Sequence, residues 1–105
     1  MANRYFIELA YDGTEYHGWQ IQPNAKSIQE TLNKCLSTIL RTEVYTVGCG
    51  RTDAGVHAAK FFAHFNIEEE LDKLEDLAFR LNQVLPRDIA IDRVFSVDED
   101  VHARF

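Results

Sequence analysis

The chain has 105 residues, close to the usual size of one domain, so we expect a single core without an internal linker. Hydrophobic residues make up 46% of it and charged residues 27%, which is ordinary for a globular protein and excludes a disordered one. No apolar run approaches the roughly 18 residues of a membrane span, and the N-terminus alternates apolar with polar residues where a signal peptide would be continuously apolar. We therefore expect a cytoplasmic protein.

The net charge of −6 argues against nucleic-acid binding by the chain as a whole, because RNA affinity depends on lysine and arginine neutralising phosphates. The acidic residues are unevenly distributed, however. Residues 68–76 hold six of the 17, whereas residues 25–60 contain five basic residues and only three acidic ones. The charge of the whole chain therefore does not exclude a local site for phosphate.

In the first half of the chain, the pattern predicts a strand and then a helix. Tyr5 to Tyr11 alternates with period two, which is typical of a strand, and Asp12 opens a loop rich in glycine and polar residues. Ser27 and Glu30 form a capping box at the start of a helix. The apolar residues that follow recur at the spacing of one helical face: Ile28, Leu32, Cys35, Leu36, Ile39 and Leu40.

The second half contains two more predicted strands, a helix and a final strand. Residues 44–49 and 59–67 are the expected strands. The next apolar residues predict a helix that Pro86 ends, because proline cannot continue the hydrogen-bond ladder: Leu71, Leu74, Leu77, Ala78 and Leu81. Residues 89–97 are predicted as the last strand, with Ile89, Ile91 and Phe95 on one face.

The predicted order β-α-β-β-α-β indicates an α+β, ferredoxin-like fold. In this fold two helices pack on one face of an antiparallel four-stranded sheet. The fold supports many functions and decides none of them.

The most informative segment for chemistry is residues 50–57, Gly-Arg-Thr-Asp-Ala-Gly-Val-His. Its two glycines permit a tight turn that presents Asp53 outward. Arg51, two residues earlier, forms either a charge pair with Asp53 or a phosphate clamp beside it. On spacing alone, a turn that merely connects two strands, with Asp53 accepting backbone N–H bonds, explains the segment as well.

Five segments, distributed along the chain, resemble one family. GRTDAGVHA at residues 50–58 resembles the active-site motif of the TruA family of pseudouridine synthases. YDGTEYHGWQIQP at 11–23 is similar to the family's first loop, SIQETLNKCL at 27–36 to its first helix, and LNQVLPRDIAI at 81–91 to the segment entering its fourth strand. VHARF at 101–105 resembles the start of the family's next segment, so the resemblance covers essentially the whole chain.

The resemblance implies conversion of uridine to pseudouridine in the anticodon stem-loop of tRNA, without metal or cofactor. It assigns Asp53 as the catalytic carboxylate, which acts on the uridine as a nucleophile or on the sugar as a base. The target base has to leave its stack to be reached. Arg51, with Thr52 beside it, would then fill the vacated space or hold a backbone phosphate, and Arg51 would also keep Asp53 ionised.

The resemblance also implies a second domain. Family enzymes continue into a domain of similar fold, which supplies a tyrosine over the target base, a basic residue to pair with the aspartate, and much of the basic RNA surface. Residues 1–105 are accordingly expected to be the N-terminal half, folded but inactive by itself. The full-length enzyme is expected to be a homodimer.

Four residues of the first loop have two interpretations each. Tyr11 and Asp12 either line the site or simply end the strand in a turn. His17 and Trp19 either stack on RNA bases or pack the loop onto the edge of the sheet.

The remaining histidines and the cysteines have simpler interpretations. His57 is expected to shape its loop, and His64 to lie on the surface of the sheet. Together with His17 and Cys49 they lack the spacing of a zinc-ligand set. Cys35 and Cys49 are expected to be reduced thiols.

Two other functions remain open on the sequence. A non-catalytic RNA-binding module is suggested by the aromatic residues of segment 60–65, on the strand where an RRM carries its RNP1 motif. The segment lacks the glycine of that motif, and an RRM has no need of an Arg-x-Asp loop between glycines. A small-ligand regulatory domain of the same fold is a third alternative that no feature favours.

Overall fold

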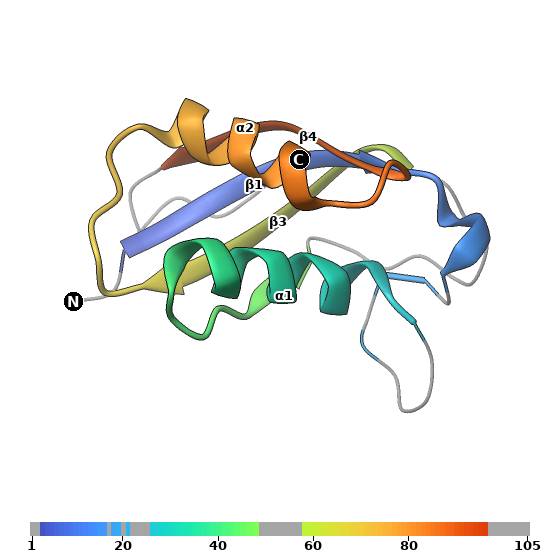
Figure 1. Ribbon diagram of the computed structural model, residues 1–105, viewed down its shortest axis with the longest axis horizontal. Helices are drawn as coiled ribbons and strands as arrows, with labels where there is room; N and C mark the ends of the chain where they lie inside the picture. Colours follow the sequence, from blue (N-terminus) through green and yellow to red (C-terminus); the bar gives the residue numbers. More distant parts are fainter. Residues whose placement is uncertain (1–2, 17, 20, 22–25, 49–57, 97–105) are drawn as a thin grey trace.

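A computed structural model of the chain describes residues 3–16, 18–19, 21, 26–48 and 58–96, which are coloured in Figure 1. The elements are β1 (Asn3–Tyr11), the short 3-10 helix η1 (Gly13–Glu15), α1 (Ile28–Leu40), β2 (Thr46–Gly48), β3 (Ala58–Ile67), α2 (Leu74–Val84) and β4 (Ile89–Ser96). The predicted order of strands and helices is therefore confirmed.

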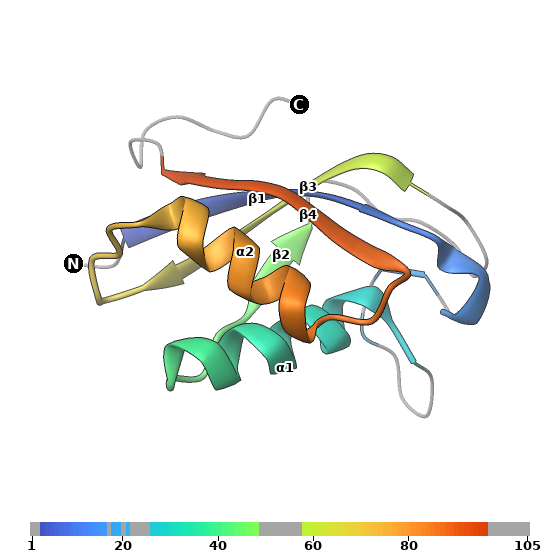
Figure 2. The ribbon, with the colours of Figure 1, turned by 45° about the horizontal axis from the view of Figure 1, so that its top comes forward.

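The four strands form one antiparallel sheet in the order β2-β3-β1-β4. Both helices lie on the same side of this sheet, as Figure 2 shows. The α+β, ferredoxin-like arrangement is thus confirmed, and no helix of the described chain covers the second face of the sheet.

The core lies between the sheet and the helices. Alternate residues of the two central strands point towards the helices and are buried there: Tyr5, Ile7, Leu9, Tyr11, Phe61, Ala63, Phe65 and Ile67. The helices contribute the apolar stripes that their spacing predicts: Ile28, Leu32, Leu36, Leu77, Ala78 and Leu81. Burial of each large apolar side chain stabilises the fold by about 1.5–3 kcal/mol.

The structure confirms the predicted start of α1 but not that of α2. Ser27 caps α1, since its Oγ accepts the backbone N–H of Glu30 at 3.2 Å. α2 begins at Leu74, three residues later than the apolar pattern indicated. Leu71 still packs on the core, but its N–H donates to the hydroxyl of Tyr5 at 2.6 Å. An apolar side chain at helical spacing can thus lie in a loop, because its backbone N–H is hydrogen-bonded to a distant side chain and not to a helix carbonyl.

The predicted face of the last strand is wrong for Phe95. Ile89 and Ile91 point towards the helices, but Phe95 pairs with Phe6 on the opposite face. The reason is a register shift, since Glu8 pairs with Arg93 while Leu9 pairs with Ile91. One extra residue in a strand exchanges the faces of all residues beyond it.

The second strand begins at Thr46, two residues later than predicted, and Gly48 is its last described residue. Val44 is buried, but its N–H donates to the side chain of Ser37 at 2.9 Å instead of to a strand. Cys49 lies outside the described residues. None of the described helices is both long enough and apolar enough to cross a membrane.

Candidate functional site

The predicted site residues divide into two groups. Tyr11, Asp12 and Trp19 are described, whereas His17, Arg51, Thr52 and Asp53, together with His57, lie outside the described residues. By chain connectivity, residues 49–57 join Gly48 at the end of β2 to Ala58 at the start of β3. The contacts around these two strand ends therefore bear on the candidate site.

Tyr11 and Trp19 both pack on one aromatic residue of β3. The ring of Tyr11 meets Phe61 edge-on with centroids 5.8 Å apart, and the Trp19 indole lies 4.8 Å from the same ring. Only 4% of Tyr11 and 2% of Trp19 is exposed. These contacts match the packing interpretation of Trp19, because a ring buried to this extent has no free face for an RNA base.

Asp12 ends β1 in a turn. Its Oδ1 accepts the N–H and the hydroxyl of Thr14 at 3.0 and 2.6 Å, and its own N–H donates to the carbonyl of Asp88 at 2.8 Å. The hydroxyl of Tyr16 donates to the Asp88 carboxylate at 2.8 Å. Burial and then this carboxylate raise the pKa of Tyr16 above its ordinary value, so the phenol remains a proton donor. Two of the motif segments thus meet through Asp88.

β2 is connected to α1 by two amide side chains. Gln29 donates from Nε2 to the carbonyl of Thr46 at 2.5 Å and accepts the N–H of Ile21 at 3.0 Å. Asn33 Oδ1 accepts both the N–H and the hydroxyl of Thr46, at 2.9 and 2.6 Å. Because Asn33 and Thr46 are buried, these bonds fix the start of β2 against the helix.

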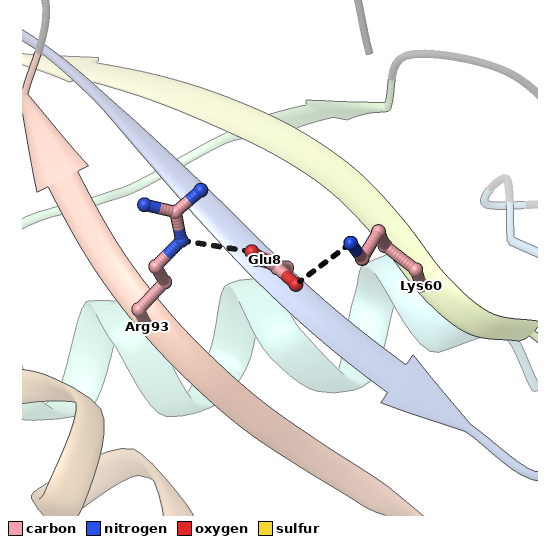
Figure 3. Close-up of polar contacts among 3 residues, drawn as sticks. All are labelled: Glu8, Lys60 and Arg93. Carbon is pink, nitrogen blue, oxygen red and sulfur yellow. Dashed lines mark hydrogen bonds and ion pairs between the residues drawn. The ribbon is translucent and has the colours of Figure 1, made fainter.

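The face of the sheet opposite the helices, here called the open face, carries a charged cluster (Figure 3). Glu8 on β1 lies between Arg93 on β4 and Lys60 on β3. Its carboxylate accepts from Arg93 Nε at 2.8 Å and lies 3.9 Å from Lys60 Nζ. The Glu8 side chain is 12% exposed, but those of Arg93 and Lys60 are 57% and 66% exposed. The carboxylate therefore orients two cations that still face solvent.

The open face also carries a row of rings across three strands. Phe6 lies 5.5 Å from His64 and 5.6 Å from Phe95, measured between ring centroids. Phe6 is 1% exposed and Phe62 is 9% exposed, so neither ring is a platform on which a base can stack. Burial and then the charge of Arg4 lower the pKa of His64, which favours the neutral imidazole.

Phe61 and Phe65 of the proposed RRM-like segment point into the core between sheet and helices. Since Phe62 is nearly buried as well, the segment lacks the exposed aromatic pair that an RRM uses. The described structure therefore does not favour the RNA-binding-module alternative.

Three polar side chains with structural roles were not identified from the sequence: Glu8 on the open face, and Tyr16 and Gln29 near the ends of β1 and β2. Glu8 could have been noticed as a charge within an apolar strand, which requires a partner. Tyr16 and Gln29 gave no such signal, because their partners are 72 and 17 residues away in the chain.

Metal ligands are not gathered in the described parts of the chain, where no three His, Cys, Asp or Glu side chains are grouped to hold an ion. Cys35 is a free thiol on α1, and burial raises its pKa, which makes it less reactive.

The fold is that of the ferredoxin-like α+β class, whose members have unrelated activities, so the motif segments have to carry the function. Residues 9–105 match a family model described as tRNA pseudouridine synthase. The chain therefore belongs to the tRNA pseudouridine synthase family, and the family resemblance of its segments is confirmed.

Individual relatives agree with this assignment. The chain is 60% identical over 102 residues to tRNA pseudouridine synthase A of Bacteroides thetaiotaomicron, covering 97% of this chain and 38% of that protein. It is 57% identical over 104 residues to the protein of the same name from Bacteroides fragilis, covering 99% and 41%. A more distant relative from Aquifex aeolicus is 41% identical over 101 residues, covering 96% and 42%. The chain thus spans about two fifths of the length of these relatives.

Proposed function

We propose that the full-length protein isomerises uridine to pseudouridine in the anticodon stem-loop of tRNA, with Asp53 as its catalytic carboxylate. The observation that carries this proposal is the family match over residues 9–105, which includes every candidate site residue. The relatives named above are each called a tRNA pseudouridine synthase A. A tRNA substrate also agrees with the expected cytoplasmic location.

The reaction requires no net change of atoms, since uridine and pseudouridine are isomers. The bond between ribose C1′ and uracil N1 breaks, the base rotates, and C1′ joins C5, which loses its hydrogen while N1 gains one. A carboxylate suits this chemistry because it can bond covalently to the base, or take a proton from the sugar, and then leave. In the proposal Arg51 keeps Asp53 ionised and, with Thr52, contacts the RNA backbone or the vacated stack.

The arrangement of the described motif residues supports this proposal. Residues 49–57 start from the end of β2, which Gln29 and Asn33 tie to α1. They end at β3, where Trp19 and Tyr11 pack on Phe61. A catalytic side chain on a loop has to be held by a rigid scaffold, and these contacts supply one at both ends.

We also propose that tRNA phosphates contact the open face. Three cationic side chains, Arg4, Lys60 and Arg93, lie on its described strands. Glu8 lies between two of them, and the exposed Asp92 directly precedes Arg93 on β4. Six acidic residues instead lie at positions 68–76, in and before the start of α2 on the helix side. The net charge of −6 is therefore compatible with a local surface of the sign that RNA requires.

The catalytic assignment can be tested with full-length protein and tRNA that carries tritium at uracil C5. Asp53→Asn should reduce tritium release at least about 10²-fold and leave tRNA affinity within a few-fold. Asp72→Asn, a matched change at an exposed acid before α2, should keep the activity of the parent. If Asp53→Asn turns over like the parent, Asp53 is not the catalytic carboxylate.

The surface assignment can be tested through salt dependence. Arg93→Gln should lower the slope of log affinity against log salt by about 1 for one lost phosphate contact. Arg80→Gln, an exposed arginine on α2, serves as the control and should leave the slope unchanged. Equal slopes for Arg93→Gln and the parent would exclude a phosphate contact at Arg93.

The family resemblance further supports two proposals about the whole protein. We propose that a second domain supplies the groups that complete the site, and that the full-length protein is a homodimer. The 105-residue chain should then fold but release no tritium from tRNA, and light scattering should give twice the mass of the full-length chain. Turnover by the 105-residue chain at the rate of the full-length protein would contradict the first proposal, and a monomeric mass the second.

A further inference from the structure

We infer that Trp19 and Gly48 are positioning residues for the catalytic segment: the indole packs on Gly48 of β2 and so fixes the point in the fold from which the chain continues towards Asp53. The inference rests on the proposed role of Asp53. It assigns to Trp19 a packing function in catalysis in place of contact with RNA.

The contact between Trp19 and Gly48 leaves no room for a side chain. A Cβ added at Gly48 would lie 2.4 Å from Trp19 Nε1, 2.8 Å from Trp19 Cε2 and 3.0 Å from Phe61 Cζ. The first two distances are far below van der Waals contact, so the strand or the indole would have to move. Gly48 has no positive φ, and the requirement for glycine here is therefore one of space alone.

The indole cannot easily withdraw, because its backbone is held by the start of α1. The carbonyl of Trp19 accepts the N–H of Gln29 at 2.9 Å, and the carbonyl of Gly18 accepts the N–H of Ile28 at 3.2 Å. Gly18 has a φ of 88°, a conformation that favours glycine and fixes the direction in which the chain enters Trp19. The ring also packs against Phe61, with centroids 4.8 Å apart.

The contact lies directly before the proposed catalytic segment. Gly48 is the last residue of β2 that the structure describes. Thr46, two residues earlier, is fixed to α1 by Gln29 and Asn33. A displacement of Gly48 would move the point from which the chain continues towards the catalytic residues. Arg51 and Asp53 come three and five residues after Gly48. A displacement of about 1 Å in a catalytic group can reduce a rate roughly 10²-fold.

The test uses full-length protein, tritium release from tRNA, and thermal unfolding. Gly48→Ala should lower kcat about 10- to 100-fold while KM for tRNA stays within about threefold, measured well below the midpoint of unfolding. Val84→Ile adds one carbon at an exposed position of α2 and should leave both constants unchanged. If Gly48→Ala lowers only the thermal midpoint and not kcat, Gly48 is structural and the inference is wrong.

A double-mutant cycle tests whether the indole is the cause. Trp19→Leu removes both indole atoms that the added methyl group would meet, so in that background Gly48→Ala should change kcat by less than about twofold. An undiminished effect of Gly48→Ala would show that Trp19 is not involved. Because the cycle compares variants within one background, it remains informative if Trp19→Leu itself lowers kcat, and it keeps the inference testable if Gly48→Ala alone fails to fold.

Asp53→Asn separates this inference from the proposed function. If Asp53→Asn is active, the proposed role of Asp53 fails whatever Gly48→Ala does. If Asp53→Asn is inactive while Gly48→Ala retains the kcat of the parent, the catalytic proposal holds and the positioning role is wrong.

Discussion

Removal of the Asn33 amide should destabilise the protein by detaching β2 from α1. Asn33 Oδ1 accepts two hydrogen bonds from Thr46, and 9% of Asn33 and 0% of Thr46 is exposed. In Asn33→Ala the buried N–H of Thr46 loses its partner, which costs about 1–3 kcal/mol, and the lost hydroxyl bond costs about 1 kcal/mol. The higher helix propensity of alanine offsets roughly 0.6 kcal/mol. The free energy of unfolding should therefore fall by about 1.5–3.5 kcal/mol.

Urea unfolding of the 105-residue chain, followed by circular dichroism, measures this change. Gln83→Ala, which removes an exposed amide on α2, is the control and should stay within about 0.5 kcal/mol of the parent. Thr46→Val removes the hydroxyl but not the N–H, so Asn33→Ala should cost about 1 kcal/mol less in that background. If Asn33→Ala unfolds at the urea concentration of the parent, the amide does not hold β2 and the reasoning fails.

Three further changes test other contacts. Burial lowers the pKa of His64 below its ordinary 6.5, so the unfolded chain binds the proton more readily and stability should fall as the pH drops below 6.5 towards the folded-state pKa. His64→Phe should remove that part of the slope in thermal midpoints measured from pH 7.5 to 5; an unchanged slope would exclude His64 as its source. Glu8→Gln should strengthen tRNA binding by the full-length protein at low salt, because Arg93 and Lys60 lose their anionic partner, whereas unaltered binding would argue against RNA on the open face. Tyr16→Phe should cost about 1–2 kcal/mol in urea unfolding through loss of its bond to a carboxylate, and a smaller loss would mean that this bond contributes little.

The predicted fold succeeded where local pattern and tertiary environment agree. The capping box at Ser27 and the apolar stripe after it predicted the start of α1 to the residue, because both signals lie within one helix. The alternation from Tyr5 to Tyr11 likewise predicted β1 as a strand. The starts of α2 and β2 were less predictable, since side-chain hydrogen bonds from Tyr5, 66 positions away, and from Ser37, seven positions away, hold the preceding backbone.

The candidate site residues were identified from a sequence motif. The contacts that hold the strands on either side of this motif could not be identified from the sequence. Arg51, Thr52 and Asp53 were selected on a pattern within eight residues, and their catalytic roles remain proposals. Trp19 had two interpretations, and the choice between them depends on its distance from Phe61, a residue 42 positions later. Patterns among neighbouring residues do not predict the distance between two side chains so far apart in the chain.

By itself the sequence determined the order of elements, the family and the residues to be tested, because periodicity, caps and motifs are properties of neighbouring residues. Only the tertiary structure decided that Phe95 and Ile91 point to opposite faces, that Glu8 orients Arg93 and Lys60, and that Gly48 lies beneath the Trp19 indole. Each of these depends on strand register or on close packing between distant segments. A register shift of one residue, or one added methyl group, changes these contacts without altering the local sequence pattern.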